Sequence, residues 1–312
     1  MRLQRWIIKS AIQRVISWLP QSHWWNGLLQ KHITKGFDLT PTRFEAQLDF
    51  CRIHLEHYLT VAAMPHEGFV ALEIGPGWFP IVPVGLYLCG ASEIRTYDIA
   101  PLIFRHTFKQ TLRRFCEYAQ NGGLQKILPR VRMERMAQLD RVLARSNRES
   151  PVRLLKELNI QTVIGDARRT GLAGGCIDLV FSTEVLEHIP REVLAGLFAE
   201  CLRISSKDGT MSHYIGMADQ FAGYDRSITP FNFLKYPASC WRLLNNPIIP
   251  QNRLRLSDYR SLIEQAGYRI VKEIETPGRL DDLRRIPLAP EFRKYSLEDL
   301  LVLYSWLVAT PA

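Results

Sequence analysis

The stretch that most constrains this chain is a short apolar run ending in an acid and two glycines, Ala71-Leu-Glu-Ile-Gly-Pro-Gly77. Residues 68–74 predict a buried strand, apolar on both sides as a central parallel strand must be. The two glycines allow a tight turn in which bare backbone approaches a ligand, because neither carries a Cβ atom. Prolines follow shortly after, as they do in the first turn of a helix. Strand, glycine turn and helix together predict the opening unit of a nucleotide-binding α/β fold.

The ends of the next predicted strands supply the context for this unit. Ile94-Arg-Thr-Tyr-Asp98 predicts a second strand that closes on an acid, 21 residues after Gly77, where such folds place a carboxylate for a ribose diol. A third strand over 162–164 and a fourth over 176–181 each lead into polar residues: Gly165-Asp-Ala167 and Ser182-Thr-Glu-Val-Leu-Glu-His188.

Two common nucleotide-binding patterns are absent. The dinucleotide pattern G-x-G-x-x-G needs a glycine where this chain has Pro80. The phosphate-loop pattern G-x-x-x-x-G-K-[S/T] does not occur. The glycine turn is therefore not explained by a nicotinamide or nucleoside-triphosphate site.

With these motifs in this order, the chain resembles the class I S-adenosyl-L-methionine (SAM) dependent methyltransferases. The resemblance covers roughly residues 66–215 and a typical ending at 253–309. It implies an α/β, three-layer, Rossmann-like seven-stranded sheet of order 3-2-1-4-5-7-6, with the last strand antiparallel. The family often has another glycine where this chain has Phe79, so we expect a bulkier turn near the methionyl end.

The resemblance also implies S-adenosyl-L-methionine as the cofactor and a set of residues that bind it. These are Glu73, Gly75 and Gly77 at the methionyl end, Asp98 at the ribose hydroxyls, Asp166 and Ala167 at the adenine, and Ser182 and Glu184 in the cleft.

Beyond the fourth strand the alternation of helices and strands continues. We expect a helix over 190–204, a strand over 210–215, a helix over 256–267, a strand over 268–274 and a buried last strand over 300–308.

Methyl transfer from a sulfonium is an in-line displacement whose leaving thioether is neutral, so the enzyme mainly positions the two reactants. A hydroxyl acceptor must also lose its proton near the transition state. We expect His188 as the base, with His213 second and Asp219 and Asp225 as alternatives. Each histidine has a structural interpretation too: His188 bonded to a nearby carbonyl, and His213 buried within a strand. The two acids could instead hold a divalent metal, which the motifs do not require, and we expect none.

Residues 2–19 predict an amphipathic helix that ends at Pro20. Six Lys or Arg and no acid precede Asp38, and four of the seven tryptophans lie in the first 25 residues. We expect the apolar face of this helix to pack on the catalytic domain. The alternative is contact of residues 1–20 with an anionic membrane surface. Charges interrupt the apolar face, so the pattern does not favour a secretory signal.

A second helix is expected over 41–59, and it carries Cys51, His54 and His57 at spacings that share a face. These three could ligate a metal, but we interpret them as ordinary polar positions on a half-exposed helix. Together with the first helix this gives a helical N-terminal extension, 1–65, before a methyltransferase domain, 66–312.

Residues 101–160 are an unusually long connection between two strands, with at least two helices expected and a break at 121–123. They hold thirteen Lys or Arg and five Asp or Glu, a net +8 that accounts for nearly all of the chain's +9. Such a patch attracts nucleic acid, acidic lipid or a phosphorylated substrate, or is simply a solvated face. No RNA-recognition pattern accompanies it, so nucleic acid is the less favoured partner.

Residues 216–252 predict a loop-rich insertion beyond the carboxyl end of a strand, where open α/β sheets bind ligands. We expect this segment to be the acceptor-binding cap. It resembles a block found in bacterial methyltransferases of polysaccharide and natural-product pathways: His213, Ile215 and Asp219 match, while Gly216 and Gln220 replace an Asp and a His.

At 46% hydrophobic and 23% charged, the composition is that of an ordinary globular protein. Six scattered cysteines without a paired spacing fit a reducing cytosol, and no uncharged run is long enough to span a membrane. We expect a cytoplasmic SAM-dependent enzyme that methylates a small-molecule or saccharide-type acceptor at oxygen. Peripheral attachment of this enzyme to a membrane is the open alternative for its location. The alternatives are an RNA or protein methyltransferase and an inactive scaffold subunit. The sequence predicts neither the acceptor nor the oligomeric state.

Overall fold

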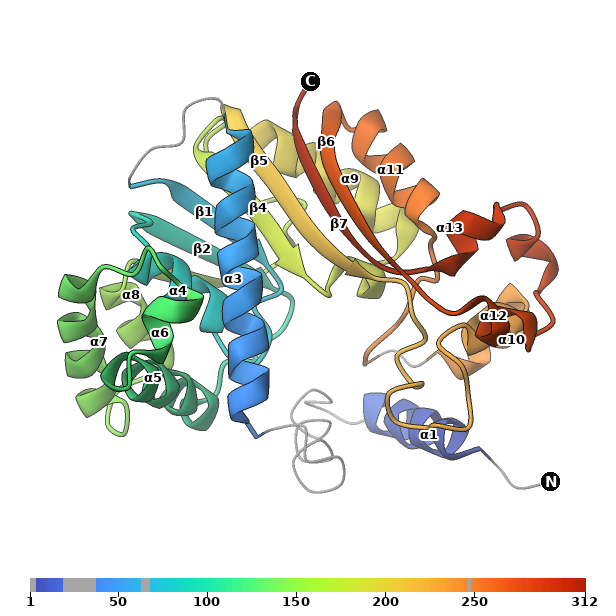
Figure 1. The fold of residues 1–312 in the computed structure, drawn as a ribbon, viewed down its shortest axis with the longest axis horizontal. Coiled ribbons are helices and arrows are strands. Elements are labelled where there is room, and N and C mark those ends of the chain that lie inside the picture. The colour runs from blue at the N-terminus through green and yellow to red at the C-terminus, as the bar shows by residue number, and fades with distance from the viewer. Residues whose placement is uncertain (1–3, 19–37, 63–67, 246–247) are drawn as a thin grey trace.

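The computed structural model describes residues 4–18, 38–62, 68–245 and 248–312. They form a seven-stranded sheet of order β3-β2-β1-β4-β5-β7-β6 with helices on both faces (Figure 1). The strands are β1 (Val70–Ile74), β2 (Glu93–Asp98), β3 (Ile160–Ile164), β4 (Ile177–Thr183), β5 (Ser205–Gly216), β6 (Tyr268–Pro277) and β7 (Val302–Pro311).

Strands β1 to β5 pair in parallel, and β7 is antiparallel to both of its neighbours, β5 and β6. The predicted strand order and the antiparallel last strand are therefore confirmed. The last strand starts two residues later than expected because a short helix, α13 (Leu297–Leu301), precedes it. The Ser296 hydroxyl caps that helix by accepting the Asp299 N–H at 3.2 Å.

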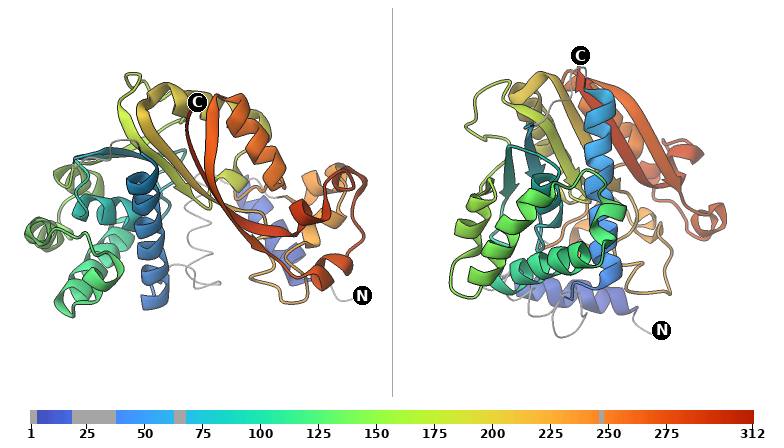
Figure 2. Two further views of the ribbon diagram at one scale, coloured as in Figure 1. Left: turned by 45° about the horizontal axis from the view of Figure 1, so that its top comes forward. Right: turned by 60° about the vertical axis from the view of Figure 1, so that its left-hand side comes forward.

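Two helical layers enclose the sheet, seen from two further directions in Figure 2. Helices α3 to α8 form one apolar cluster with one face, and α9 and α11 form another with the opposite face. The helices are α1 (Arg5–Ser17), α3 (Pro41–Val61), α4 (Ile81–Leu88), α5 (Arg105–Gln120), α6 (Gly123–Ile127), α7 (Met133–Arg145), α8 (Pro151–Glu157), α9 (Arg191–Ile204), α10 (Ala238–Leu244), α11 (Leu256–Gln265), α12 (Leu280–Arg284), α13, and the single-turn η1 (Leu186–His188), η2 (Asn232–Lys235) and η3 (Pro290–Phe292).

The expected acceptor cap has a small apolar core of its own. Phe231, Phe233 and Trp241 from residues 216–252 pack with Leu283 and Phe292, which come from the connection between β6 and β7. Two insertions far apart in the chain therefore build one cap beside the carboxyl end of β5.

The basic connection over 101–160 folds as helices α5 to α8 and strand β3, and its expected break separates α5 from α6. Part of its charge holds the fold together. Arg135 donates to the backbone carbonyls of Tyr87 and Ala91, and its guanidinium stacks over the Tyr87 ring. Arg145 pairs with Glu157. Part of the excess positive charge is therefore structural.

Helix α1 packs on the cap rather than standing apart from the protein. The Trp6 ring lies 5.5 Å from the Phe221 ring, between centroids. The Asp225 carboxylate accepts the Trp6 N–H at 3.2 Å, so a cap residue satisfies an N–H group that the first turn of the helix leaves free. The expected packing of the helix on the protein is present.

The face that packs is not the apolar face predicted from the sequence. Trp6, Ser10 and Gln13 are buried, whereas the apolar stripe remains exposed at Ile8 (45%), Ile12 (42%), Val15 (55%) and Trp18 (75%). The predicted helix end at Pro20 and two of the early tryptophans lie outside the described residues. In the described part of the chain, no helix is both long and apolar enough to cross a bilayer.

Candidate functional site

A cavity of about 580 Å³ opens at the carboxyl ends of β1, β2, β3 and β4, the size range of a nucleoside-like ligand. Eight of the twelve predicted site residues line it: Glu73, Gly75, Gly77, Asp98, Asp166, Ala167, Glu184 and His188. Trp78 and Phe79 also line the cavity and do not fill it.

Glu73 places a buried carboxyl group in the wall of this cavity. The residue is 4% exposed, and its Oε2 atom has no hydrogen-bond partner among the described residues. Burial, and secondarily the negative charge of Asp98, raise the pKa of Glu73 to about 8. A buried acid without a partner is a site for a cation, which would restore its ionised form.

The two glycines of the turn serve different purposes. Both have positive φ, 71° at Gly75 and 65° at Gly77, which a side chain rarely tolerates. A Cβ atom on Gly75 would also lie 2.7 Å from the Val185 side chain, so this glycine lets the ends of β1 and β4 approach each other. A Cβ atom on Gly77 would meet no described atom within 4 Å. The backbone at Gly77 therefore faces open space in the cavity wall.

The two acids that follow β2 and β3 come together at the same edge. The Gly165 N–H donates to the Asp98 carbonyl at 2.9 Å, which fixes the two strand ends side by side. The Asp98 carboxylate accepts the Ala100 N–H at 3.0 Å. Asp166 differs, because both of its carboxylate oxygens accept from the Arg168 guanidinium, which lowers the pKa of Asp166.

His188 forms part of the cavity wall and is bonded to the cap at the same time. Its Nδ1 lies 2.7 Å from the Pro250 carbonyl oxygen, so Nδ1 carries the hydrogen and Nε2 keeps its lone pair. Burial lowers the pKa of His188, and the bond to Pro250 opposes this effect. The ring is therefore neutral at pH 7 and able to accept a hydrogen bond.

Four predicted site residues lie away from the cavity. One of them, Asp225, bonds to Trp6 of α1, and the other three are Ser182, His213 and Asp219. Ser182 and His213 are both fully buried and bond to each other, Oγ to Nδ1 at 2.7 Å, with His213 against Phe198 of α9. Successive strand residues point to opposite faces, so Ser182 turns away where Thr183 lines the cavity. Asp219 is 2% exposed and accepts from the Phe221 N–H and the Asn232 amide, which shapes the cap loop. None of these three side chains is placed to touch a bound cofactor.

Helix α3 brings to the cavity residues that the sequence analysis did not anticipate. Arg43 and Gln47 line the cavity from its first turns, and the Arg43 guanidinium lies 5.0 Å from the Phe79 ring centroid. Nothing in the sequence around them signals this, because the contact depends on where α3 crosses the sheet.

The interpretation of Cys51, His54 and His57 as half-exposed positions is wrong. All three are buried, because α3 packs on α4 and on strands β4 and β5 at these positions. Cys51 points to α4, donating to the Val82 carbonyl, while the two histidines point to β5. They do not converge, and the described residues contain no cluster of three His, Cys, Asp or Glu suited to a metal ion.

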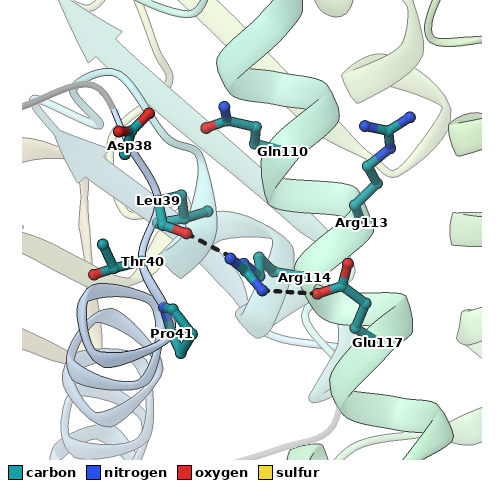
Figure 3. Close-up of a pocket in the computed structure, with 8 residues that line it drawn as sticks. All are labelled: Asp38, Leu39, Thr40, Pro41, Gln110, Arg113, Arg114 and Glu117. Atoms are coloured by element: carbon teal, nitrogen blue, oxygen red, sulfur yellow. Dashed lines mark hydrogen bonds and ion pairs between the residues drawn. The ribbon is translucent and has the colours of Figure 1, made fainter. Parts of the chain in front are cut away.

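A second, shallower hollow of about 380 Å³ lies between the start of α3 and α5 (Figure 3). There Arg114 donates to the Leu39 carbonyl at 3.2 Å and pairs with Glu117 at 2.9 Å. A second basic side chain in this hollow, Arg113, faces the same opening as Asp38. No predicted site residue lines this hollow.

The chain is similar in part to known methyltransferases. A family model described as a methyltransferase domain matches residues 130–212, which include β3 and β4 and end within β5. Among curated proteins, none matches the sequence. Similar solved structures include a protein from Pyrococcus horikoshii OT3 (14% identity, TM-score 0.49, covering 91% of this chain and 98% of that chain). Another is geranyl diphosphate C-methyltransferase from Streptomyces coelicolor A3(2), solved with Mg²⁺, geranyl diphosphate and S-adenosyl-L-homocysteine (11% identity, TM-score 0.46, 83% and 79%).

Proposed function

Since this chain contains a class I SAM-dependent methyltransferase domain, we propose that it methylates a small-molecule or saccharide-type acceptor at a hydroxyl oxygen. The observation that carries the proposal is the buried Glu73 carboxyl in the wall of a nucleoside-sized cavity, because its Oε2 has no hydrogen-bond partner among the described residues. When bound, the cofactor supplies an electrophilic methyl group on a sulfonium.

We assign the cofactor-binding roles by chemistry. Glu73 pairs with the ammonium of the methionyl group, and the backbone of Gly75 and Gly77 lets that group approach. Asp98 accepts hydrogen bonds from the ribose hydroxyls. The turn at Asp166 and Ala167 borders the adenine, with Arg168 holding the Asp166 carboxylate in place. Glu184 lines the cavity at the end of β4, beside the same glycine turn.

The acceptor enters between the cavity and the cap. The cap residues Ile248, Ile249 and Pro250 line the cavity, and the Pro250 carbonyl holds the His188 ring. We propose that His188 touches the acceptor, with Nε2 accepting a hydrogen bond from one of its hydroxyls. A saccharide-type acceptor suits this arrangement because it offers several neighbouring hydroxyls.

Labelled SAM tests the assignment of the cofactor site. Asp98→Ala removes two hydrogen bonds to a charged acceptor, each worth about 1.5–3 kcal/mol, so we expect binding weaker by about a hundredfold or more. Asp208→Ala, an exposed acid outside the cavity, is the control and leaves affinity unchanged. Unchanged affinity in Asp98→Ala would show that the nucleoside does not sit against β2.

A methyl-transfer assay over saccharide and polyketide-like alcohols tests the acceptor class. We expect methyl ethers of one of these alcohols, identified by mass spectrometry. Methyl transfer only to RNA, with retention that falls steeply as salt rises, would favour the basic helices α5 to α8 as the acceptor site instead.

We further propose that the exposed stripe of α1 rests on an anionic membrane. Ile8, Ile12, Val15 and Trp18 form one apolar face, and Arg5 beside it is exposed. No acid occurs in the first 37 residues, so the charge suits acidic headgroups. Because α1 packs on the cap, such contact brings the acceptor site next to the lipid surface.

Flotation with phosphatidylglycerol-containing vesicles tests this contact. We expect the protein to float with anionic vesicles, and Ile12→Glu/Val15→Glu, two exposed substitutions, to abolish flotation without altering SAM binding. Equal flotation of the variant would mean that other residues bind the membrane. No flotation of the wild type, with self-association lost in the variant, would mean that a second copy of the chain covers the stripe.

A further inference from the structure

Four side chains form a continuous hydrogen-bonded path from the cavity wall into the layer between α3 and β5. Thr183 Oγ1, at the cavity, lies 3.1 Å from His54 Nε2. His54 Nδ1 lies 2.9 Å from Ser212 Oγ, and Ser212 Oγ lies 2.9 Å from His57 Nδ1. The residues come from β4, β5 and two successive turns of α3.

The donors and acceptors along this path are consistent in either direction. In one arrangement Thr183 donates to His54, His54 donates to Ser212, and Ser212 donates to His57. Reversing every bond also satisfies all four groups, because a hydroxyl and a neutral imidazole each both donate and accept. The two arrangements differ by the passage of one proton along the path, which is the property that a proton relay requires.

Neither histidine is suited to hold a positive charge. Burial drives the pKa of His54 well below its ordinary value, and the neighbouring His57 and His213 lower it further. Burial and the positive charge of Lys272 lower the pKa of His57 to about 4. The edges of both rings meet Trp306, with centroids 4.9 and 5.2 Å apart. A proton that enters this path is therefore passed on, because neither His54 nor His57 holds it as a stable imidazolium.

We propose that Thr183, His54, Ser212 and His57 form a proton relay that removes the proton of the acceptor hydroxyl during methyl transfer. The inference rests on the proposed O-methylation. The acceptor oxygen bonds to the methyl carbon, and the carbon–sulfur bond breaks with its electron pair going to sulfur. The acceptor proton passes to Thr183 Oγ1 while one proton shifts along each link, and the proton on His57 Nε2 leaves to bulk water.

In this scheme Thr183 is a catalytic residue, since it lies in the cavity wall, and the other three act through it. His188 keeps the separate role of accepting a hydrogen bond from a hydroxyl that is not methylated. The two roles give different kinetics. Loss of the relay lowers kcat, whereas loss of a binding contact raises KM.

The test is steady-state kinetics at saturating SAM, with the alcohol that the acceptor assay identifies. We expect Ser212→Ala to lower kcat about tenfold to hundredfold, with the acceptor KM and SAM affinity unchanged. Thr183→Val should show the same loss, and Thr183→Ser should restore the rate. The matched control is Thr210→Val, on the same strand as Ser212, since its buried Oγ1 has no partner in the described part of the chain.

The solvent isotope effect distinguishes a relay from a structural role. In mixtures of H₂O and D₂O the wild-type rate should depend non-linearly on the deuterium fraction, because several protons move together. In Ser212→Ala the dependence should become linear. A kcat within twofold of wild type in Ser212→Ala, or a hundredfold loss of kcat in His188→Gln, would overturn the relay and identify His188 as the base.

A separate readout needs no acceptor, so the failure of the relay and that of the proposed O-methylation remain distinguishable. With ¹⁵N-labelled histidine and S-adenosyl-L-homocysteine bound, we expect NMR to show His54 and His57 both neutral from pH 6 to 8. Ser212→Ala should change the tautomer populations of both rings. Titration of either ring to imidazolium in that range, or signals unaffected by Ser212→Ala, would contradict the relay even if alcohols are methylated.

Discussion

At the scale of single residues, Glu73 links the geometry of the cavity to pH. Its carboxyl is buried without a hydrogen-bond partner for Oε2 in the described residues, and its pKa is raised to about 8. An ammonium group binds the ionised form, so binding near pH 7 must expel a proton. The affinity for such a ligand therefore falls as the pH falls below 8.

Calorimetric titration with S-adenosyl-L-homocysteine, which keeps the ammonium group, measures this linkage. We expect the dissociation constant to rise by about tenfold for each pH unit below 8 and to level off above it. The apparent enthalpy at pH 7 should vary with the ionisation enthalpy of the buffer. Glu73→Gln should bind more weakly at pH 8 and lose most of the pH dependence. A flat wild-type profile would place the ammonium elsewhere.

Single residues also show how far a motif specifies a site. Glu73, Asp98 and Glu184 are at the cavity because each lies at or next to the carboxyl end of a parallel strand. Ser182 belongs to the same motif but lies on the other face, since one position along a strand reverses the direction of the side chain. The motif predicted which edge of the sheet holds the site. The alternating direction of side chains along the strand decided which residues of the motif face the cavity.

At the scale of elements, the fit between α3 and α4 decides where α3 crosses the sheet. A Cβ atom on Gly85 of α4 would lie 2.6 Å from the Cys51 sulfur of α3, so the two helices touch at this glycine. Cys51 lies on α3 between Arg43, which lines the cavity, and His54, which bonds to Thr183.

Gly85→Ala should therefore lower the free energy of unfolding by about 1–3 kcal/mol through overpacking. Gly196→Ala, in α9, is the control. Its added methyl group meets only the flexible Arg168 side chain, at 3.3 Å, so we expect a gain of about 0.5–1 kcal/mol from the helix. Denaturant unfolding of both variants and of Cys51→Ala/Gly85→Ala measures the contact. An unaltered free energy of unfolding in Gly85→Ala would mean that α3 and α4 can move apart at this contact without loss of stability.

Helix α1 illustrates a limit of periodicity as evidence for packing. Its apolar stripe was expected to be the buried face, but the cap binds Trp6, Ser10 and Gln13 instead. The stripe pattern identified the helix and its amphipathic character correctly. Which face is covered depends on the shape of the partner surface, where the ring of Phe221 and the carboxylate of Asp225 receive Trp6.

At the scale of the whole molecule, Arg255 connects the catalytic sheet to the cap. Its guanidinium is fully buried and donates to the carbonyls of Met217 at 2.9 Å, Leu300 at 3.3 Å and Val302. These carbonyls lie just after β5, in α13 and at the start of β7. Burial lowers the pKa of Arg255 to about 10, so the group remains charged at pH 7.

Arg255→Leu should destabilise the protein by several kcal/mol, because three carbonyls lose their donor at about 1–3 kcal/mol each. The exposed Arg269→Leu on β6 is the control and should change stability by less than about 0.5 kcal/mol. Thermal unfolding monitored by circular dichroism measures both. If Arg255→Leu unfolds like the wild type, water or a neighbouring donor satisfies the three carbonyls.

The strand order was implied by the resemblance to a known family. The sequence by itself determined the strands, the glycine turn and the acids at the strand ends. Each of these depends on short-range patterns: apolar runs of strand length, a backbone that needs positive φ, and polar residues just past a strand end. Only the tertiary structure decided that His54, His57, Ser212 and Thr183 meet, since their contacts join positions more than 120 residues apart. It also decided which face of α1 is covered. No local pattern encodes such pairings, because they arise from how helices cross the finished sheet.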